Sequence, residues 1–350
     1  MYNNYIIKNK NMVLPTKKRS KNIFSIFFYI LAFFLVIFCI RYFGTIDDNI
    51  KLFQQVRPIW LLVALAAQAG TYFFNALAFR VLLKVYTQKA IFSIRELFEI
   101  SVVSLFFNQT IPSAGWSGKA FFSKELIKKG IAPEESVSLM FLELMTFYIA
   151  MILVICSLFF VSIFYDFPEF FFLIFLLGIL IFSILGTFMV IASKKKVLDY
   201  LFRKIKKIGF IRRQLEKYEA MLDGPVADKS KNLLHTIIVK KGLFIRAIFC
   251  GAGVVACDSL TIFALFFGFG IPVNFIIVIA GYMLTQIVTL VPILPGSLLV
   301  FEGGMTFFFT RLGVPMEVAA AVTLLYRCLS FWLPIPLGFF LLKKIQTPKV

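Results

Sequence analysis

Long apolar runs separated by short polar segments dominate this chain. Six of them carry few charges, and they occupy residues 23–40, 58–83, 133–163, 169–192, 241–268 and 316–342. A helix needs roughly 20 apolar residues to cross a bilayer, and each run is close to that length. The pattern predicts an all-α, polytopic membrane protein with about six full spans.

Two further apolar stretches, 96–129 and 273–312, are interrupted in the middle. The interruptions contain Pro112 and Gly115 in the first stretch, and Pro292, Pro295 and Gly296 in the second. Each half is about a dozen residues, too short to cross at a helical rise of 1.5 Å per residue. We therefore expect two re-entrant helical hairpins. Their opened backbone must lie inside the bundle, because lipid cannot satisfy it.

The composition agrees with a membrane protein, since 60% of the residues are hydrophobic and only 16% are charged. The chain has 37 Lys and Arg against 18 Asp and Glu, a net charge of +19. With the N-terminus in the cytoplasm, six crossings and two hairpins place most of the basic residues on the cytoplasmic side. Membrane proteins carry an excess of Lys and Arg in their cytoplasmic segments, and this positive-inside rule explains the net charge of +19 without a nucleic-acid partner. We expect a multi-pass protein of the plasma membrane.

This predicted topology divides the chain into five parts. They are a basic cytoplasmic tail (1–22), a first membrane half (23–193), a basic amphipathic linker (194–240), a second membrane half (241–343) and a short cytoplasmic tail (344–350). The linker is expected either to lie on the anionic cytoplasmic leaflet or to be a solvated helix.

The two hairpins resemble each other in sequence, and the predicted topology places them on opposite sides of the membrane. Gly130-Ile131-Ala132-Pro133-x-Glu135 follows the first, and Gly313-Val314-Pro315-x-Glu317 follows the second. Weak repeats in opposite orientations are typical of transporters, in which discontinuous helices meet near the midplane around the substrate. The alternative is a chance similarity of Pro and Gly positions.

Several charged residues fall within the predicted bilayer zone. A charge at the bilayer centre costs about 2.5–3.5 kcal/mol, so Glu143, Asp258, Glu302 and Arg327 must face inward or be paired. Glu302 can reach Arg327, and Lys119 and Glu143 occupy nearly the equivalent positions of the first half. This suggests a polar cavity between the halves, or ion pairs that only join helices. For Asp258, as for Glu99 and Arg311, snorkelling toward a segment end is the alternative.

Phosphate is the ligand that this set of groups favours. Lys119, Arg327 and the helix N-termini after Gly118 and Gly296 offer cations and free N–H groups. A phospholipid or an isoprenoid (polyprenyl-phosphate) lipid would bring phosphate while its tails stay in the bilayer. A single His235, five cysteines without a CxxC pair and the lack of a nucleotide-binding motif indicate neither metal nor cofactor, and no enzyme activity.

Two motifs carry a family resemblance that covers about residues 20 to 343. Asn108-x3-Pro112-x2-Gly115-x3-Lys119 with Glu143, and Pro292-x2-Pro295-Gly296-x5-Glu302 with Tyr326-Arg327, resemble the transmembrane region of lysylphosphatidylglycerol synthases, a flippase-like family. The resemblance implies a lipid translocase whose substrate-binding residues are those of the two motifs.

The chain departs from the family pattern at three positions. Lys119 and Ser297 stand where the family usually has Arg and a second Gly, and Leu144 stands where it has Arg. Lys keeps the charge but loses the bidentate fork of Arg, so the substrate is expected to differ. The aminoacyl-transferase domain of the full-length synthases has no counterpart in this sequence, so synthase activity is not expected.

Two other functions remain open. One is a membrane glycosyltransferase that uses a polyprenyl-phosphate sugar, with Asp47 and Asp48 as an acidic pair, although the predicted outer loops are short. The other is a non-catalytic membrane scaffold that acts through the basic linker. A homo-oligomer is compatible with either.

Overall fold

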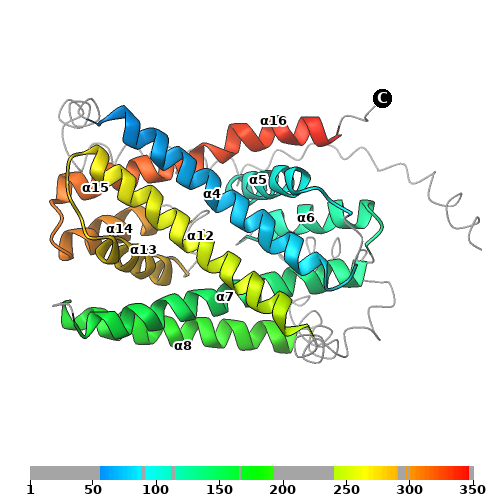
Figure 1. Cartoon of the computed structure of the whole chain (residues 1–350), viewed down its shortest axis with the longest axis horizontal. Helices are drawn as coiled ribbons and strands as arrows, with labels where there is room; N and C mark the ends of the chain where they lie inside the picture. Colours follow the sequence, from blue (N-terminus) through cyan, green and yellow to red (C-terminus); the bar gives the residue numbers. More distant parts are fainter. Residues whose placement is uncertain are drawn as a thin grey trace, which may run out of the picture.

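A computed structural model describes residues 56–87, 91–111, 115–131, 133–164, 167–192, 240–290, 297 and 299–346. Within these ranges every regular element is helical (Figure 1). The helices are α4 (Pro58–Leu83), α5 (Ile94–Thr110), α6 (Trp116–Lys128), α7 (Pro133–Ser162), α8 (Glu169–Ala192), α12 (Lys241–Gly268), α13 (Phe275–Thr289), α14 (Val300–Arg311), α15 (Met316–Arg327), the π-helix η3 (Cys328–Trp332) and α16 (Pro334–Gln346).

Five segments of the described chain are long and apolar enough to cross a membrane. They are Pro58–Leu83, Glu135–Ser162, Glu169–Met189, Lys241–Gly268 and Met316–Ile345. They coincide with the last five of the six predicted spans, and the all-helical membrane class is confirmed. The tail 1–22, the span 23–40, Asp47, Asp48 and the linker up to residue 239 lie outside the described residues.

The last of these five segments is a broken helix. α15 passes into η3, where the Leu333 N–H donates to the Cys328 carbonyl oxygen at 2.8 Å, and α16 begins at Pro334. A proline lacks the N–H that would continue an α-helical ladder. Short π-helical turns within α-helices are frequent at functional sites.

α4 and α12 form an antiparallel seam between the two halves (Figure 1). At one end the Arg57 N–H donates to the Gly268 carbonyl oxygen at 3.0 Å, and at the other the Lys240 ammonium donates to the Val85 carbonyl oxygen at 2.6 Å. A Cβ added at Gly70 would lie 2.9 Å from the sulfur of Cys257. The small residue therefore allows the two helices to approach closely.

Two pairs of short helices occupy the stretches predicted as hairpins. α5 packs on α6 in the first, and α13 packs on α14 in the second. α4 contacts α5 and α7, while α12 contacts α13 and α15, so the same neighbours recur in both halves. In Figure 1, α5 and α6 lie toward one end of the molecule and α13 and α14 toward the other. This arrangement is compatible with an inverted repeat, and re-entry into a membrane stays a prediction.

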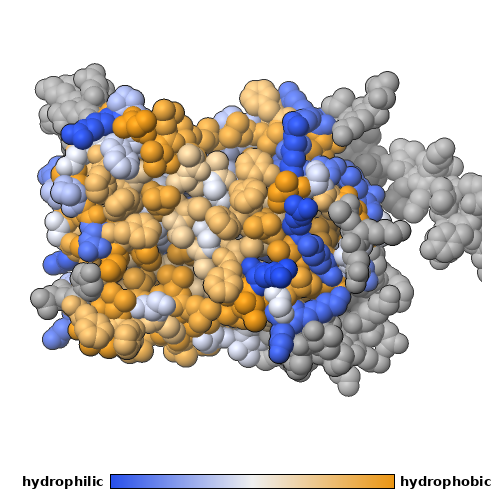
Figure 2. All heavy atoms as spheres, viewed as in Figure 1, coloured by the Kyte–Doolittle hydropathy of each residue, from blue (hydrophilic) through white to orange (hydrophobic). Residues whose placement is uncertain are grey.

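Apolar side chains form a band across the middle of the visible face (Figure 2), with hydrophilic residues at both ends. Exposed large side chains such as Leu62, Leu153 and Leu173 are what a lipid-facing surface requires. Most described cations gather where α4, α6 and α16 end and α5 and α12 begin. This basic end comprises Arg80, Lys84, Arg95, Lys124, Lys128, Lys129, Lys240, Lys241, Arg246, Lys343 and Lys344. The opposite end has Arg57 and Arg311 among the described residues.

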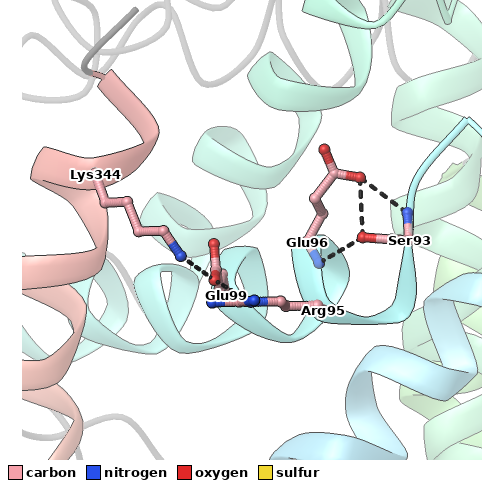
Figure 3. Close-up of polar contacts among 5 residues, drawn as sticks. All are labelled: Ser93, Arg95, Glu96, Glu99 and Lys344. Atoms are coloured by element: carbon pink, nitrogen blue, oxygen red, sulfur yellow. Dashed lines mark hydrogen bonds and ion pairs between the residues drawn. The ribbon is translucent and has the colours of Figure 1, made fainter. Parts of the chain in front are cut away.

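At the basic end, surface charges tie α16 to α5 (Figure 3). Glu99 lies 3.2 Å from Arg95 and 2.5 Å from Lys344, measured between the bonded nitrogen and oxygen atoms. Ser93 and Glu96 form a capping box in which each side chain accepts the other residue's backbone N–H. These bonds, first that from the Ser93 N–H, hold the pKa of Glu96 below its usual range, and Lys129 adds to the effect.

Candidate functional site

Glu302 and Arg327 form an ion pair between α14 and α15. Glu302 Oε1 lies 2.7 Å from Arg327 Nε, and the two side chains are only 12% and 8% exposed. The predicted contact between these residues is therefore present. The guanidinium also lies over the rings of Phe301 and Phe331, at 4.8 and 4.3 Å from their centroids.

One oxygen of this pair is left over. Glu302 Oε2 is buried and has no hydrogen-bond partner among the described residues. A buried carboxylate oxygen without a donor is costly, because it has lost its water and gained nothing in return.

A second ion pair joins α6 to α7. The Lys119 ammonium donates to Glu143 Oε2, with the side chains 20% and 11% exposed, and it also lies 5.3 Å from the ring centroid of Phe79. In each half, the second helix of the hairpin is therefore linked to the following helix by one cation and one carboxylate. The order of the charges is reversed between the halves, as the sequence comparison of their positions predicts.

The turn of the first hairpin is closed by Asn108. Its Oδ1 accepts the Gly118 N–H at 2.7 Å and lies 3.4 Å from the Ser117 hydroxyl. Gly115, at the N-cap of α6, has a φ of 84°, which favours glycine. The helix expected to begin after Gly118 instead begins at Trp116, and the Gly118 N–H within its first turn is bound by Asn108. Pro112 lies outside the described residues.

The second hairpin shows why one departure from the family pattern matters. Ser297 stands where the family usually has Gly, and its φ is 52°. Glycine adopts this left-handed backbone without the steric cost that Ser pays, while the Ser297 hydroxyl donates to the Thr289 carbonyl oxygen at 3.1 Å. Pro292, Pro295 and Gly296 lie outside the described residues, and their roles stay predictions.

A polar cluster that the sequence reasoning missed surrounds Asp258. Asp258 Oδ1 accepts from the Thr71 hydroxyl at 2.9 Å and from Gln68 Nε2 at 3.4 Å, and Oδ2 accepts from the Tyr282 hydroxyl at 2.7 Å. Tyr326 also interacts electrostatically with this carboxylate. The alternative of snorkelling is wrong for Asp258, which is 6% exposed and faces four other side chains.

Part of this Asp258 cluster leaves a signal in the sequence. Gln68, Thr71 and Tyr72 lie at spacings of three and four residues, so they share one face of an otherwise apolar helix. Such a face predicts a buried polar partner. The partner of this polar face depends on how α4, α12, α13 and α15 pack together. The spacing of residues along the sequence does not predict this packing.

Polar side chains of α4 and of the first hairpin donate hydrogen bonds to η3, next to Tyr326 at the end of α15. Tyr326 precedes Arg327, stacks on Phe301 at 5.8 Å between ring centroids, and meets the ring of Tyr282 edge-on. The Tyr72 hydroxyl donates to the Leu329 carbonyl oxygen, and Gln109 Nε2 donates to the Ser330 carbonyl oxygen, both at 3.1 Å. The break in the last helix thus contacts the first hairpin.

In the described part of the chain, no three His, Cys, Asp or Glu side chains gather in one place. The two ion pairs and the Asp258 cluster present cations, carboxylates and hydroxyls on seven helices: α4, α6, α7, α12, α13, α14 and α15.

Comparison with known proteins agrees with the resemblance seen in the sequence. Residues 22–338 match the family described as the lysylphosphatidylglycerol synthase TM region. A UPF0104 membrane protein of Methanocaldococcus jannaschii is 26% identical over 317 residues, covering 89% of this chain and 91% of the relative. One of Methanothermobacter thermautotrophicus is 21% identical over 310 residues, covering 84% and 87%. The chain belongs to the family of the lysylphosphatidylglycerol synthase transmembrane region.

Proposed function

We propose that this protein moves a phosphate-bearing lipid between the leaflets of its membrane without chemically changing it. The observation that carries the proposal is the pair of buried ion pairs, Lys119 with Glu143 and Glu302 with Arg327. Each joins a hairpin helix to the helix that follows it. Membership of a lipid-related membrane family supports a lipid as the substrate.

A lipid headgroup can replace the partner of each charge in these ion pairs, so that no charge is left unpaired. Phosphate binds Arg327 or Lys119 through charge-assisted hydrogen bonds. The carboxylate that it displaces then accepts a donor of the headgroup, such as an ammonium or hydroxyl group. Glu302 Oε2, which has no hydrogen-bond partner among the described residues, is the first such acceptor. The exchange avoids the several kcal/mol that an isolated buried charge would cost.

The two ion pairs would provide one headgroup-binding site in each half of the molecule. In transporters with inverted halves, rocking of one half against the other exposes a central site to each side in turn. The seam between α4 and α12 is the contact about which such rocking would occur. No nucleotide-binding motif is seen in the sequence, so we propose that movement is downhill or coupled to an ion.

The test is a translocation assay in reconstituted vesicles that contain a fluorescent phospholipid and a quencher on one side. We expect the double variant Glu302→Leu/Arg327→Met to remain folded, since apolar residues of similar volume often replace a buried ion pair without loss of stability. Its rate of lipid movement should fall at least about tenfold, because one lost charge-assisted contact is worth about 1.5–3 kcal/mol.

Arg95→Gln provides the matched control. It removes one cation of an ion pair, but Arg95 is exposed at the basic end and should not affect lipid movement. If the folded double variant moved lipid at the wild-type rate, the ion pairs would only join helices and the proposal would fail.

A further inference from the structure

Asp258 is a buried carboxylate whose hydrogen-bond partners are all formally neutral. They are Gln68 and Thr71 from α4 and Tyr282 from α13 among the described residues, and Tyr326 from α15 interacts electrostatically with the carboxylate. Among the described residues, no Lys or Arg forms an ion pair with Asp258. It therefore differs from Glu143 and Glu302, each of which has a cation.

A negative charge in this setting is expensive. Hydroxyl donors offset part of the desolvation, but an unpaired ion in an apolar bundle still costs free energy, and uptake of a proton removes that cost. A protonated carboxyl group, however, gains a donor and needs an acceptor. The question is whether the cluster provides one.

Gln68 provides this acceptor. Its Oε1 is buried without a hydrogen-bond partner in the described structure, and the whole residue is 2% exposed. Its Nε2 lies 3.4 Å from Asp258 Oδ1, which is long for a hydrogen bond. A half-turn of the amide exchanges Nε2 and Oε1 and brings an acceptor to the same oxygen. Gln68 can therefore serve either form of Asp258.

We propose that Asp258 and Gln68 form a proton-binding site at the seam of α4 and α12. On binding, an O–H bond forms at Asp258 Oδ1, the carboxylate charge is neutralised, and the new hydroxyl donates to Gln68 Oε1. Thr71 and Tyr282 remain as neighbours in both forms. Because the site joins the helices of the two halves, it is placed to couple proton uptake to their relative movement. This coupling rests on the proposed function, whereas proton binding does not.

The other titratable groups near Asp258 are weakly acidic. They are Tyr72 on α4, Cys257 on α12, Tyr282 on α13 and Tyr326 on α15. α7 also packs on α12, but none of the hydrogen bonds of Asp258 in the described chain comes from it. Arg327 interacts electrostatically with Tyr326 and forms an ion pair with Glu302. Asp258 is thus the carboxyl group of this cluster, and its titratable neighbours are phenol hydroxyls and a thiol.

The test is an infrared titration of the purified full-length protein, following the C=O stretch of protonated carboxyl groups. Asp258→Asn should remove one titrating carboxyl group. Thr71→Val removes a donor to the charged form, so the proton affinity of Asp258 should rise about tenfold, the equivalent of about 1.4 kcal/mol. Gln68→Met removes the acceptor for the protonated form together with only a long donor contact of 3.4 Å to the charged form, so the affinity should fall, by up to about tenfold.

The direction of the Gln68→Met effect decides the proposal. If Gln68 were only a donor to the carboxylate, its loss would raise the proton affinity, as with Thr71→Val, and the proposed site would be wrong. Loss of radioactive sodium binding in Asp258→Asn, with no titrating carboxyl group in the wild type, would also overturn it in favour of a sodium site.

Vesicle experiments separate the two proposals. With an imposed pH gradient, we expect wild-type lipid movement to accelerate and Asp258→Asn to lose only that acceleration. A protein that titrates as described but moves no lipid contradicts the proposed function alone. Lipid movement without the Asp258 titration contradicts the proton site alone.

Discussion

Arg327 is held in place by both charge and packing. It pairs with Glu302 and lies between the rings of Phe301 and Phe331. Arg327→Ala removes the cation and leaves Glu302 buried without a partner. We expect the unfolding free energy in detergent to fall by about 3–5 kcal/mol, because breaking a buried pair on one side exposes the full cost of the other charge.

Thermal unfolding followed by tryptophan fluorescence measures this loss. Glu302→Leu/Arg327→Met is the control, since it removes both charges and should recover most of the stability. Equal losses in the single and double variants would mean that the side chains matter for packing and not as a charge pair.

The individual side chains differ in how far the sequence predicts them. The contact of Glu302 with Arg327 is predictable, because two charges in an apolar region need each other and their helices are neighbours in the chain. The role of Asn108 is not, since its amide serves a turn formed ten residues later. The Asp258 cluster depends on four helices, and only its Gln68 and Thr71 share a recognisable face.

The first hairpin depends on a glycine at the contact of α5 with α6. A Cβ at Gly118 would lie 2.3 Å from the Ser104 carbonyl oxygen and 2.6 Å from Asn108 Oδ1. Gly118→Ala should therefore separate the two helices and lower stability by about 1–3 kcal/mol, the usual cost of overpacking. The measurement is the melting temperature of the purified protein.

Gly303→Ala is the matched control for this variant. Gly303 lies on the exposed side of α14, and nothing is within 4 Å of a Cβ placed there. The change should be neutral or stabilising by up to about 1 kcal/mol, since Ala favours a helix more than Gly does. Unaltered melting of Gly118→Ala would contradict the close packing of the hairpin.

The capping box at the start of α5 should make the stability of the protein depend on pH in the acidic range. The capping bonds keep the pKa of Glu96 below its unfolded value, so its ionised form stabilises the fold above that unfolded value. The contribution is lost as the pH falls through the lowered pKa. We expect the melting temperature of the wild type to drop more steeply than that of Glu96→Gln on acidification below the usual Glu range, about 4.3.

The difference should be small, because solvent screens a partly exposed group. Ser93→Ala provides a second measurement and should cost about 1 kcal/mol at neutral pH. Parallel acid profiles for the wild type and Glu96→Gln would show that the capping box does not set this pKa.

At the level of elements, helix type and position follow from the length of the apolar runs. The break at η3 does not, because the sequence predicts one continuous span over 316–342 despite Pro334 and Pro336. Pro334 removes one backbone donor, but the sequence does not show that the helix adjusts by a π-helical turn at Cys328–Trp332 just before it.

The whole molecule has one strongly basic end, and the sequence predicts that this end faces the cytoplasm. In a protein without its native cysteines, Lys124→Cys marks the basic end and Glu317→Cys the opposite end. A membrane-impermeant maleimide added to intact cells should label Glu317→Cys alone. Lys124→Cys should react only after the cells are opened, and labelling of both from outside would contradict the topology.

In the proposed function, a lipid headgroup enters the bundle beside the two ion pairs. Photocrosslinking with a phospholipid that carries the reactive group on its headgroup, followed by peptide mass spectrometry, locates this headgroup. We predict crosslinks to α6, α7, α14 and α15 near Lys119 and Arg327, and their loss in Glu302→Leu/Arg327→Met near the second pair. Crosslinks confined to the exposed side chains of α8, around Leu173 and Leu180, would mean that the headgroup stays outside the bundle.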